Sequence, residues 1–151
     1  MATLNYTTTV PVSRTAAEVQ AQLAEAGADA VAVKYVNKQP VGVSFLLTTP
    51  HGPRHFDLPV NVAGVQQVLT QQYNSGEIRG GMSKQVYTSA EHAGRVAWRI
   101  AKDWLEAQVA LIEAQMVTLD QVMLPYLRVA EGRTLYEVYR EREQLALEVG
   151  S

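Results

Sequence analysis

Apolar and polar positions alternate with a period of two through much of the first third of the chain, which is typical of half-buried strands. Four such segments are rich in β-branched and aromatic residues and span residues 3–12, 29–37, 41–48 and 54–60. Short turns rich in proline, asparagine and glycine separate the last three. The pattern predicts a four-stranded, mainly antiparallel sheet. Its expected inward-facing residues include Phe45, Leu47, Phe56 and Leu58.

Helix-start signals dominate the rest of the chain. A capping box places a hydroxyl three residues before a Glu or Gln, and the two side chains satisfy backbone N–H groups of the first helical turn. Such boxes begin at Thr15, Thr88, Thr118 and Thr134. They predict one helix between the first two strands and three helices after the sheet, the longest over residues 89–116. Asn61 is the expected N-cap of a further helix, and Pro125 is expected to end the helix that Thr118 starts.

The order of these elements predicts a single α+β domain over residues 1–151. Residues 1–61 are expected to be mainly sheet with one intervening helix, and residues 62–151 to form a helical half dominated by the long helix. A chain of this length can bury about two thirds of its unfolded surface, so it needs no partner to form a core.

The long helix is apolar on two sides. One row contains Val96, Ile100, Trp104, Ala107 and Leu111, and the other contains Trp98, Leu105, Val109, Ile112 and Met116. A helix that is apolar on two sides must be covered on two sides. The sheet can cover one of them, and we expect a second subunit to cover the other, which predicts a homo-oligomer. The alternative is a central helix buried on all sides within its own chain.

Composition narrows the classes of function. The formal net charge is −2, which argues against a dedicated duplex-DNA-binding protein. The chain has no cysteine, which excludes disulfides, thiolate metal sites and cysteine nucleophiles. The first residues lack the pattern of a signal peptide, and no stretch reaches the roughly 18 apolar residues of a membrane span. We therefore expect a soluble, cytoplasmic protein that does not enter membranes.

Positive charge is concentrated between residues 73 and 102. The cations there are Arg79, Lys84, Arg95, Arg99 and Lys102, against two acids, Glu77 and Glu91. The first two cations flank Gly80 and Gly81, which allow backbone amides to approach an anion closely. The segment is not a P-loop, because no Gly-Lys-Ser/Thr follows the glycines. It predicts an anion-contacting loop, and the alternative is a flexible connector between helices.

Arg95, Trp98, Arg99 and Lys102 share one face of the long helix, at positions i, i+3, i+4 and i+7. Cations beside an indole can clamp a phosphate while the ring stacks on a base. The alternative is a solvated stripe, in which Arg99 pairs with Asp103 and Trp98 belongs to the core. Together with the loop, this face gives the candidate ligand site: Arg79, Gly80, Gly81, Lys84, Arg95, Trp98, Arg99 and Lys102.

No catalytic or metal-binding signature accompanies these residues. His51 and His55 flank a turn without a third ligand nearby, and His92 is distant in sequence. No Ser-His-Asp arrangement can be named, so we expect no catalytic residue, metal or cofactor and no enzyme activity. The tyrosines at 126, 136 and 139 either wall a ligand site or lock the C-terminal turn onto the core.

Short motifs spread over most of the chain resemble small proteins of unassigned function that phages and prophages encode. They are Thr-Thr-Val-Pro-Val-Ser at 8–13, Arg-His-Phe-Asp-Leu-Pro at 54–59, Ala-Trp-Arg at 97–99, Lys-Asp-Trp at 102–104, Met-Leu-Pro-Tyr-Leu at 123–127 and Gly-Arg-Thr-Leu at 132–135. The resemblance implies antagonism of host defence, or accessory work in replication or recombination, inside the host cell. It implies no functional residue.

These observations predict a non-catalytic binding protein that sequesters a compact phosphate-bearing ligand, such as a nucleotide signal of host defence. A local positive field on a mildly acidic protein suits a compact anion better than a long polyanion. Two alternatives remain open. One is a single-stranded nucleic-acid-binding accessory protein, and the other is a protein–protein inhibitor or scaffold.

Overall fold

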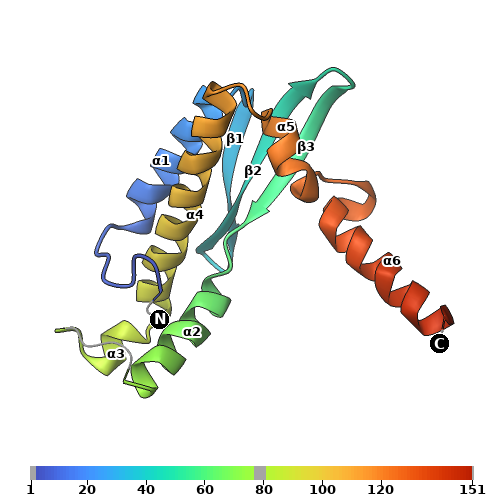
Figure 1. The fold of residues 1–151 in the computed structure, drawn as a ribbon. Helices are drawn as coiled ribbons and strands as arrows, with labels where there is room; N and C mark the ends of the chain where they lie inside the picture. The colour runs from blue at the N-terminus through green and yellow to red at the C-terminus, as the bar shows by residue number, and fades with distance from the viewer. Residues whose placement is uncertain (1–2, 77–80, 151) are drawn as a thin grey trace.

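The computed structural model describes residues 3–76 and 81–150 and has an α+β architecture. Strands β1 (Ala30–Val36), β2 (Gln39–Thr49) and β3 (Gly52–Pro59) form an antiparallel sheet in the order β1-β2-β3. The helices are α1 (Val12–Glu25), α2 (Val62–Asn74), α3 (Lys84–Tyr87), α4 (Ala90–Glu113), α5 (Leu119–Met123) and α6 (Leu135–Gly150), with the short 3-10 helices η1 (Leu124–Tyr126) and η2 (Ala130–Gly132) before α6. Figure 1 shows α1 and α4 side by side against one face of the sheet, while α6 extends away from it.

The prediction of four strands is wrong, because residues 3–12 form turns and the start of α1 instead of a strand. Asn5 has a φ of 63°, which reverses the chain, and Tyr6 and Thr8 donate turn hydrogen bonds to Thr3 and Asn5. The threonine-rich composition favours a strand, but tertiary context overrides such a preference. The outer edge of β3 is bridged by Leu127, which pairs with Phe56.

The capping box at Thr15 is also wrong. Helix α1 begins at Val12, and Pro11 stands at its N-cap without a side-chain hydrogen bond. Thr15 is fully buried, and Glu18 reaches across to Arg99 of α4 instead of back to the helix start. Two polar residues that match a capping box therefore serve the packing of α1 against α4.

Most other helix starts follow the prediction. Asn61 accepts from the backbone N–H of Gly64 at 3.0 Å and caps α2, and Thr118 caps α5. At Thr134 the box is reciprocal, since its hydroxyl accepts from the Glu137 N–H while the Glu137 carboxylate accepts from the Thr134 N–H. The start of α4 is displaced by one residue, because Ser89 rather than the preceding threonine is its cap.

The hairpins are confirmed, with strand ends within two residues of the prediction. Asn37 and Lys38 both have positive φ, 50° and 65°, as a two-residue turn requires. The expected inward residues are buried, and the rings of Phe45 and Phe56 stack with their centroids 5.1 Å apart. The alternation therefore identified the face of the sheet that meets α1 and α4.

Helix α4 is buried around most of its first half, where it packs against α1 and α2, and is partly exposed in its second half. Its Trp98 and Leu105 have no exposed surface, whereas Trp104 and Leu111 are 37% and 36% exposed. The helix is therefore not covered on all sides by its own chain. None of the described helices is both long and apolar enough to cross a membrane.

The segment that leads into α6, residues 127–135, is attached to the outer edge of β3, and we call it the root of α6. Arg128 donates to both carboxylate oxygens of Asp57, at 2.8 and 2.6 Å, and this hydrogen-bonded pair lowers the pKa of Asp57. The backbone N–H of Arg128 donates to His55 O, and that of Leu135 donates to Leu127 O, both at 2.8 Å. These bonds fix where α6 begins.

Substitution of Gly42 tests how closely the backbones of β2 and β3 pack at this position. A Cβ atom at Gly42 would lie 2.7 Å from the backbone oxygen of Leu58, which cannot rotate away. We expect Gly42→Ala to lower the free energy of unfolding by about 1–3 kcal/mol, measured by urea denaturation. A Cβ at Gly81 meets open space, so Gly81→Ala is the control and should change it by less than about 0.5 kcal/mol. Equal effects of the two substitutions would contradict this packing.

Candidate functional site

The residues predicted as one ligand site are divided by the fold. Arg79 and Gly80 lie outside the described residues. Gly81 and Lys84 are exposed beside the short helix α3, and the other four predicted residues lie on α4. Of the predicted set, only Arg95 and Trp98 line the largest cavity found in the described part of the chain.

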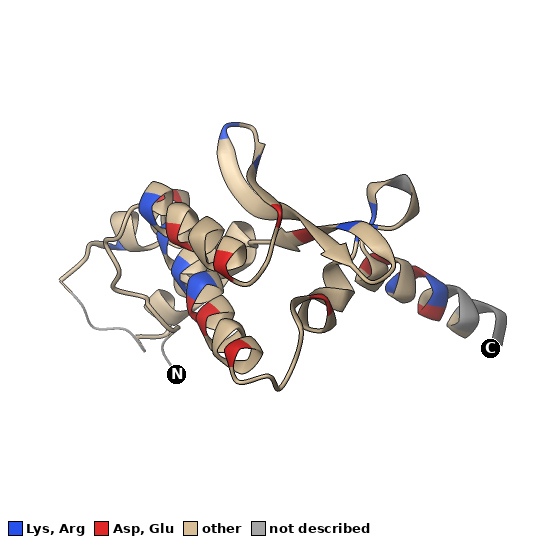
Figure 2. Ribbon diagram, turned by 90° about the horizontal axis from the view of Figure 1, so that it is seen from above, with Lys and Arg blue, Asp and Glu red and all other residues tan. Residues whose placement is uncertain are grey.

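Two cations of the α4 stripe are engaged by carboxylates. Arg99 donates to Glu18 of α1 at 2.8 Å, and Lys102 donates to Glu106 at 2.8 Å. The pairing of Arg99 with Asp103 is wrong, because Asp103 accepts from the side-chain amide of Asn5 at 2.7 Å. Figure 2 shows both positive and negative residues along α4. Arg95, Arg99 and Lys102 follow one another along the helix, and Glu18 and Glu106 neutralise the last two.

Trp98 belongs to the core. It has no exposed surface, and its indole N–H donates to the backbone oxygen of Pro40 at 3.3 Å. It therefore lies beneath the cavity floor and presents no free ring face for a base. The role of Trp98 as a stacking platform is wrong, and its alternative as a core residue is confirmed.

The cavity has a volume of about 780 Å³ and lies where three helices begin. Its wall includes the first residues of α1, α2 and α4, together with the first residues of β2. We call it the helix-start cavity. It is lined by Thr9, Pro11, Val12, Gln39, Pro40, Val41, Val60, Asn61, Val62, Ala63, Gln66, Ala90, Glu91, Gly94, Arg95 and Trp98. The start of a helix carries a partial positive charge, so three starts at one wall favour a negative ligand.

Arg95 supplies the full positive charge of this wall. Its side chain is 18% exposed, and its guanidinium lies 3.4 Å from both Glu91 and His92, distances that make weak contacts. Its Nε is buried and finds no hydrogen-bond partner among the described residues. Because Glu91 is 88% exposed, its pairing with Arg95 is screened by water. Arg95 therefore keeps more donor capacity for a ligand than Arg99.

His92 orients Arg95 from below and was not predicted as part of the site. It is fully buried, and its Nε2 donates to the backbone oxygen of Tyr6 at 2.7 Å, so its Nδ1 is left to accept from Arg95. Burial lowers the pKa of His92, the hydrogen bond to Tyr6 raises it, and the charge of Arg95 lowers it further. The only signal in the sequence was the spacing of three residues between His92 and Arg95.

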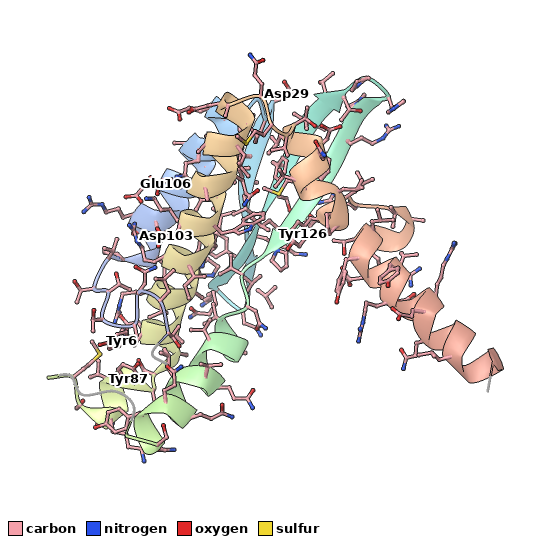
Figure 3. The ribbon with its side chains drawn as sticks, in the orientation of Figure 1. Tyr6, Asp29, Tyr87, Asp103, Glu106 and Tyr126 are labelled. Carbon is pink, nitrogen blue, oxygen red and sulfur yellow. The ribbon has the colours of Figure 1, made fainter. Side chains whose placement is uncertain are left out.

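An aromatic cluster supports His92. The ring of Tyr87 lies 5.3 Å from that of His92, 5.6 Å from that of Tyr73 and 6.4 Å from that of Tyr6. Figure 3 shows Tyr6 and Tyr87 together near the start of α4. Burial raises the pKa of Tyr87 to about 12, so its hydroxyl stays neutral. The cluster holds the imidazole, and through it Arg95, in one position.

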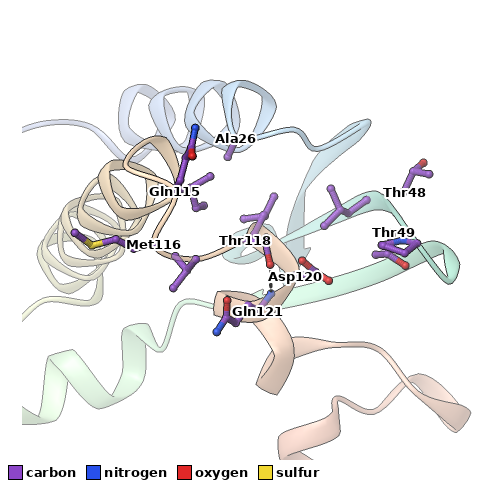
Figure 4. Close-up of a pocket in the computed structure, with 13 residues that line it drawn as sticks. Ala26, Thr48, Thr49, Gln115, Met116, Thr118, Asp120 and Gln121 are labelled. Atoms are coloured by element: carbon purple, nitrogen blue, oxygen red, sulfur yellow. Dashed lines mark hydrogen bonds between the residues drawn. The ribbon is translucent and has the colours of Figure 1, made fainter.

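A second cavity, of about 490 Å³, lies between the β2–β3 turn and the end of α4 (Figure 4). Its polar groups come from threonines, glutamines and Asp120, and its lining contains no Lys or Arg. The dashed line in Figure 4 is the cap of α5, from the Gln121 N–H to the Thr118 hydroxyl. An anion would meet a carboxylate and no cation there, so the helix-start cavity is the better anion site.

The remaining candidates do not form a site. The described residues contain no group of three or more His, Asp or Glu that could hold a metal ion. Tyr126 packs edge-on against Trp104, with ring centroids 6.5 Å apart, which agrees with its role in locking the C-terminal turn. Tyr136 is half-exposed on α6 and shares with Tyr126 a cavity of about 390 Å³ between the sheet and the start of α6, whereas Tyr139 is exposed further along the helix and does not line it.

Comparison of the chain with protein-family models, with curated proteins and with solved structures finds no match.

The buried His92 makes stability depend on pH. Because its pKa is lowered from 6.5 in the folded state, the unfolded chain binds more protons as the solution is acidified. The contribution of neutral His92 is therefore fully present above pH 6.5 and is lost as the pH falls. We expect the free energy of unfolding to decline by at most about 1.4 kcal/mol per pH unit from this one group.

Urea denaturation between pH 7 and about pH 4.5 measures this decline, in a range above that in which Asp57 titrates. His92→Gln keeps a donor for Tyr6 but cannot take up a proton, so its stability should fall less over the same range. Parallel curves for the two proteins would contradict the assignment. Titration of the imidazole by NMR, followed in the unmodified protein, gives a second measure.

Proposed function

We propose that this protein is a non-catalytic binding protein that holds a compact phosphate-bearing anion in the helix-start cavity. One observation carries the proposal: Arg95, with a buried and unpartnered Nε, lies in a cavity of about 780 Å³ at whose wall three helices begin. Helix starts and a guanidinium are the groups that most often bind phosphate oxygens in proteins.

The size and lining of the cavity favour a nucleotide-sized ligand. Small-molecule sites have volumes of roughly 300–1,000 Å³ and are mainly apolar with a few polar groups. Here Pro11, Val12, Val41 and Val60 provide apolar wall, while Asn61 and Gln66 provide amides. A ligand with a charged phosphate and a flat, partly apolar body matches both parts of this lining.

Helix α1 gives the anion its most accessible backbone donors. Among the described residues, its N-cap, Pro11, makes no side-chain hydrogen bond to the first turn, whereas Asn61 and Ser89 cap α2 and α4. The first N–H groups of a helix lack partners inside the helix and are left for a ligand or water. They add donors beside Arg95 at the cavity wall.

A protein that only sequesters its ligand must enclose that ligand tightly and needs no catalytic groups. The cavity wall holds one carboxylate, Glu91, which is 88% exposed and lies beside Arg95, and it holds no histidine, serine or lysine. The roles expected for the site are revised accordingly. Arg95 supplies the charge, Arg99 and Lys102 balance carboxylates, and the apolar wall replaces Trp98 as the surface for the body of the ligand.

The biological setting follows from the resemblance to small phage and prophage proteins. In that setting, a protein that binds a nucleotide without changing it removes a signal of host defence from the host cell. A compact anion is favoured over single-stranded nucleic acid because Glu18 and Glu106 interrupt the cations that would track a strand.

Substitution of Arg95 tests the site. We expect Arg95→Gln to weaken binding of the best ligand from a panel of nucleoside monophosphates and cyclic nucleotides by about 10- to 100-fold, because a charge-assisted hydrogen bond is lost. Isothermal titration calorimetry measures the change. Arg99→Gln, one turn further along α4, is the matched control and should change affinity by less than about threefold. Failure of the whole panel to bind, or equal losses in both variants, would refute the site.

Competition with oligonucleotides separates the proposal from binding of single strands. If the ligand is compact, a mononucleotide and a single-stranded oligonucleotide at the same molar concentration should displace equal fractions of a labelled ligand. Affinity for a strand falls with the logarithm of salt with a slope of about −0.7 for each contacted phosphate. An oligonucleotide that binds far more tightly than the mononucleotide, with a slope that grows with its length, would favour the nucleic-acid alternative.

A further inference from the structure

Helix α6 is an arm that makes few contacts with the other described elements of the chain. It has 16 residues, so it is about 24 Å long, and its main contact within the chain is with η1 at its root. Tyr136, Tyr139 and Leu147 along it are 52%, 57% and 70% exposed. Helices of this length are marginal in water without tertiary packing, so the arm needs a surface to lie on.

The arm is held away from its own helical layer. The reciprocal box between Thr134 and Glu137 and the bond from Leu135 N–H to Leu127 O fix its first turn. Arg128 fixes the preceding segment to Asp57 on β3. Figures 1 and 3 show the arm leading away from α4. To fold back onto α4, the arm would have to break these bonds at its root.

A surface of matching character lies on α4 and α2. One stripe of α4 carries no charge and consists of Ala97, Ile100, Ala101, Trp104, Gln108 and Leu111. Helix α2 beside it has no charged residue in 13 positions, and its Val68 is 41% exposed. A groove of about 330 Å³ joins them, with Val65, Trp104 and Tyr126 in its lining. We call this surface the uncharged face.

We propose that the arm of a second copy lies on the uncharged face, so that two chains exchange their α6 helices. The depletion of charge and the half-exposed Trp104 are typical of the centre of a protein interface. Ala97 at the start of the stripe is buried, and from residue 100 to residue 111 the accessible part rises about 17 Å, about two thirds of the length of the arm. Tyrosines and a leucine on the arm face a tryptophan and valines on the uncharged face, so both sides bury apolar surface.

A second copy fits better than an unrelated protein because one molecule carries both surfaces. Each chain carries one arm, which is held away from its own groove, and one groove. Exchange between two copies about a twofold axis fills both grooves and leaves no arm free. Arg140 and Glu143 lie on the same face of the arm as Tyr136, Tyr139 and Leu147, so their charged ends must reach the rim of the interface, whereas Glu141 and Arg142 lie on other sides of the arm. The proposal does not depend on the helix-start cavity.

Measurement of the mass of the full chain in solution tests the exchange. Sedimentation equilibrium should give twice the chain mass of 16.6 kDa. The double variant Tyr139→Glu/Leu147→Glu places charge on the arm at two exposed positions, which leaves the fold intact, and should halve the mass. Tyr35→Glu is the matched control, because Tyr35 is 63% exposed on β1 and lies outside the exchange, and it should keep the dimer.

Quenching of tryptophan fluorescence by acrylamide identifies the surface involved. Trp98 has no exposed surface and stays protected, so a change in quenching reports Trp104. We expect weak quenching in the dimer and stronger quenching in the double variant. A monomeric unmodified chain would overturn the proposal, whether Trp104 is accessible or covered by its own arm. A dimer with accessible Trp104, or one that survives the double substitution, would overturn it equally.

Discussion

The docking of Trp98 under the sheet is the interaction on which the rest of the structure depends. Its indole is fully buried, and its N–H donates to Pro40 O at the start of β2, which joins the longest helix to the sheet. A buried indole finds a hydrogen-bond partner because an unmade bond there costs about 1–3 kcal/mol. This bond therefore fixes both the position of α4 along its axis and its rotation about that axis, relative to β1 and β2.

Once that rotation is fixed, the positions of the two surfaces of α4 for which we propose roles follow. With 3.6 residues per turn, Trp104 lies about 240° around the helix from Trp98 and points to the uncharged face. Arg95, about 60° from Trp98 and one turn nearer the helix start, faces the cavity at which α1 and α2 also begin. One tryptophan in the core thus places a cation in a cavity and a second tryptophan at the surface.

Local signals predicted much of the fold. Both hairpins, the long helix and the caps at Asn61, Thr118 and Thr134 follow from a few adjacent residues, since turn and cap geometry is decided within about four positions. The prediction of a first strand was wrong because Asn5 adopts a left-handed conformation. The capping box predicted at Thr15 was wrong because the Thr15 hydroxyl is buried and donates to the backbone oxygen of Pro11, while Glu18 pairs with Arg99 of α4.

The candidate site was harder to predict, because its geometry depends on distant segments. Nothing near Arg99 in the sequence shows that Glu18, 81 residues away, neutralises it. The cavity itself combines the starts of α1, β2, α2 and α4, which no local pattern relates. Periodicity could place Arg95 and Trp98 near one another on the helix. It could not decide which of them faces a ligand and which faces the core.

The central claim is that the helix-start cavity holds a compact phosphate-bearing anion. The most direct test is to purify the protein from cells at low salt, denature it and identify the released small molecules by mass spectrometry. The account predicts one phosphate-containing small molecule per chain, absent from the Arg95→Gln variant and retained by Arg99→Gln. Release of no such molecule, or its equal release from both variants, would contradict the account.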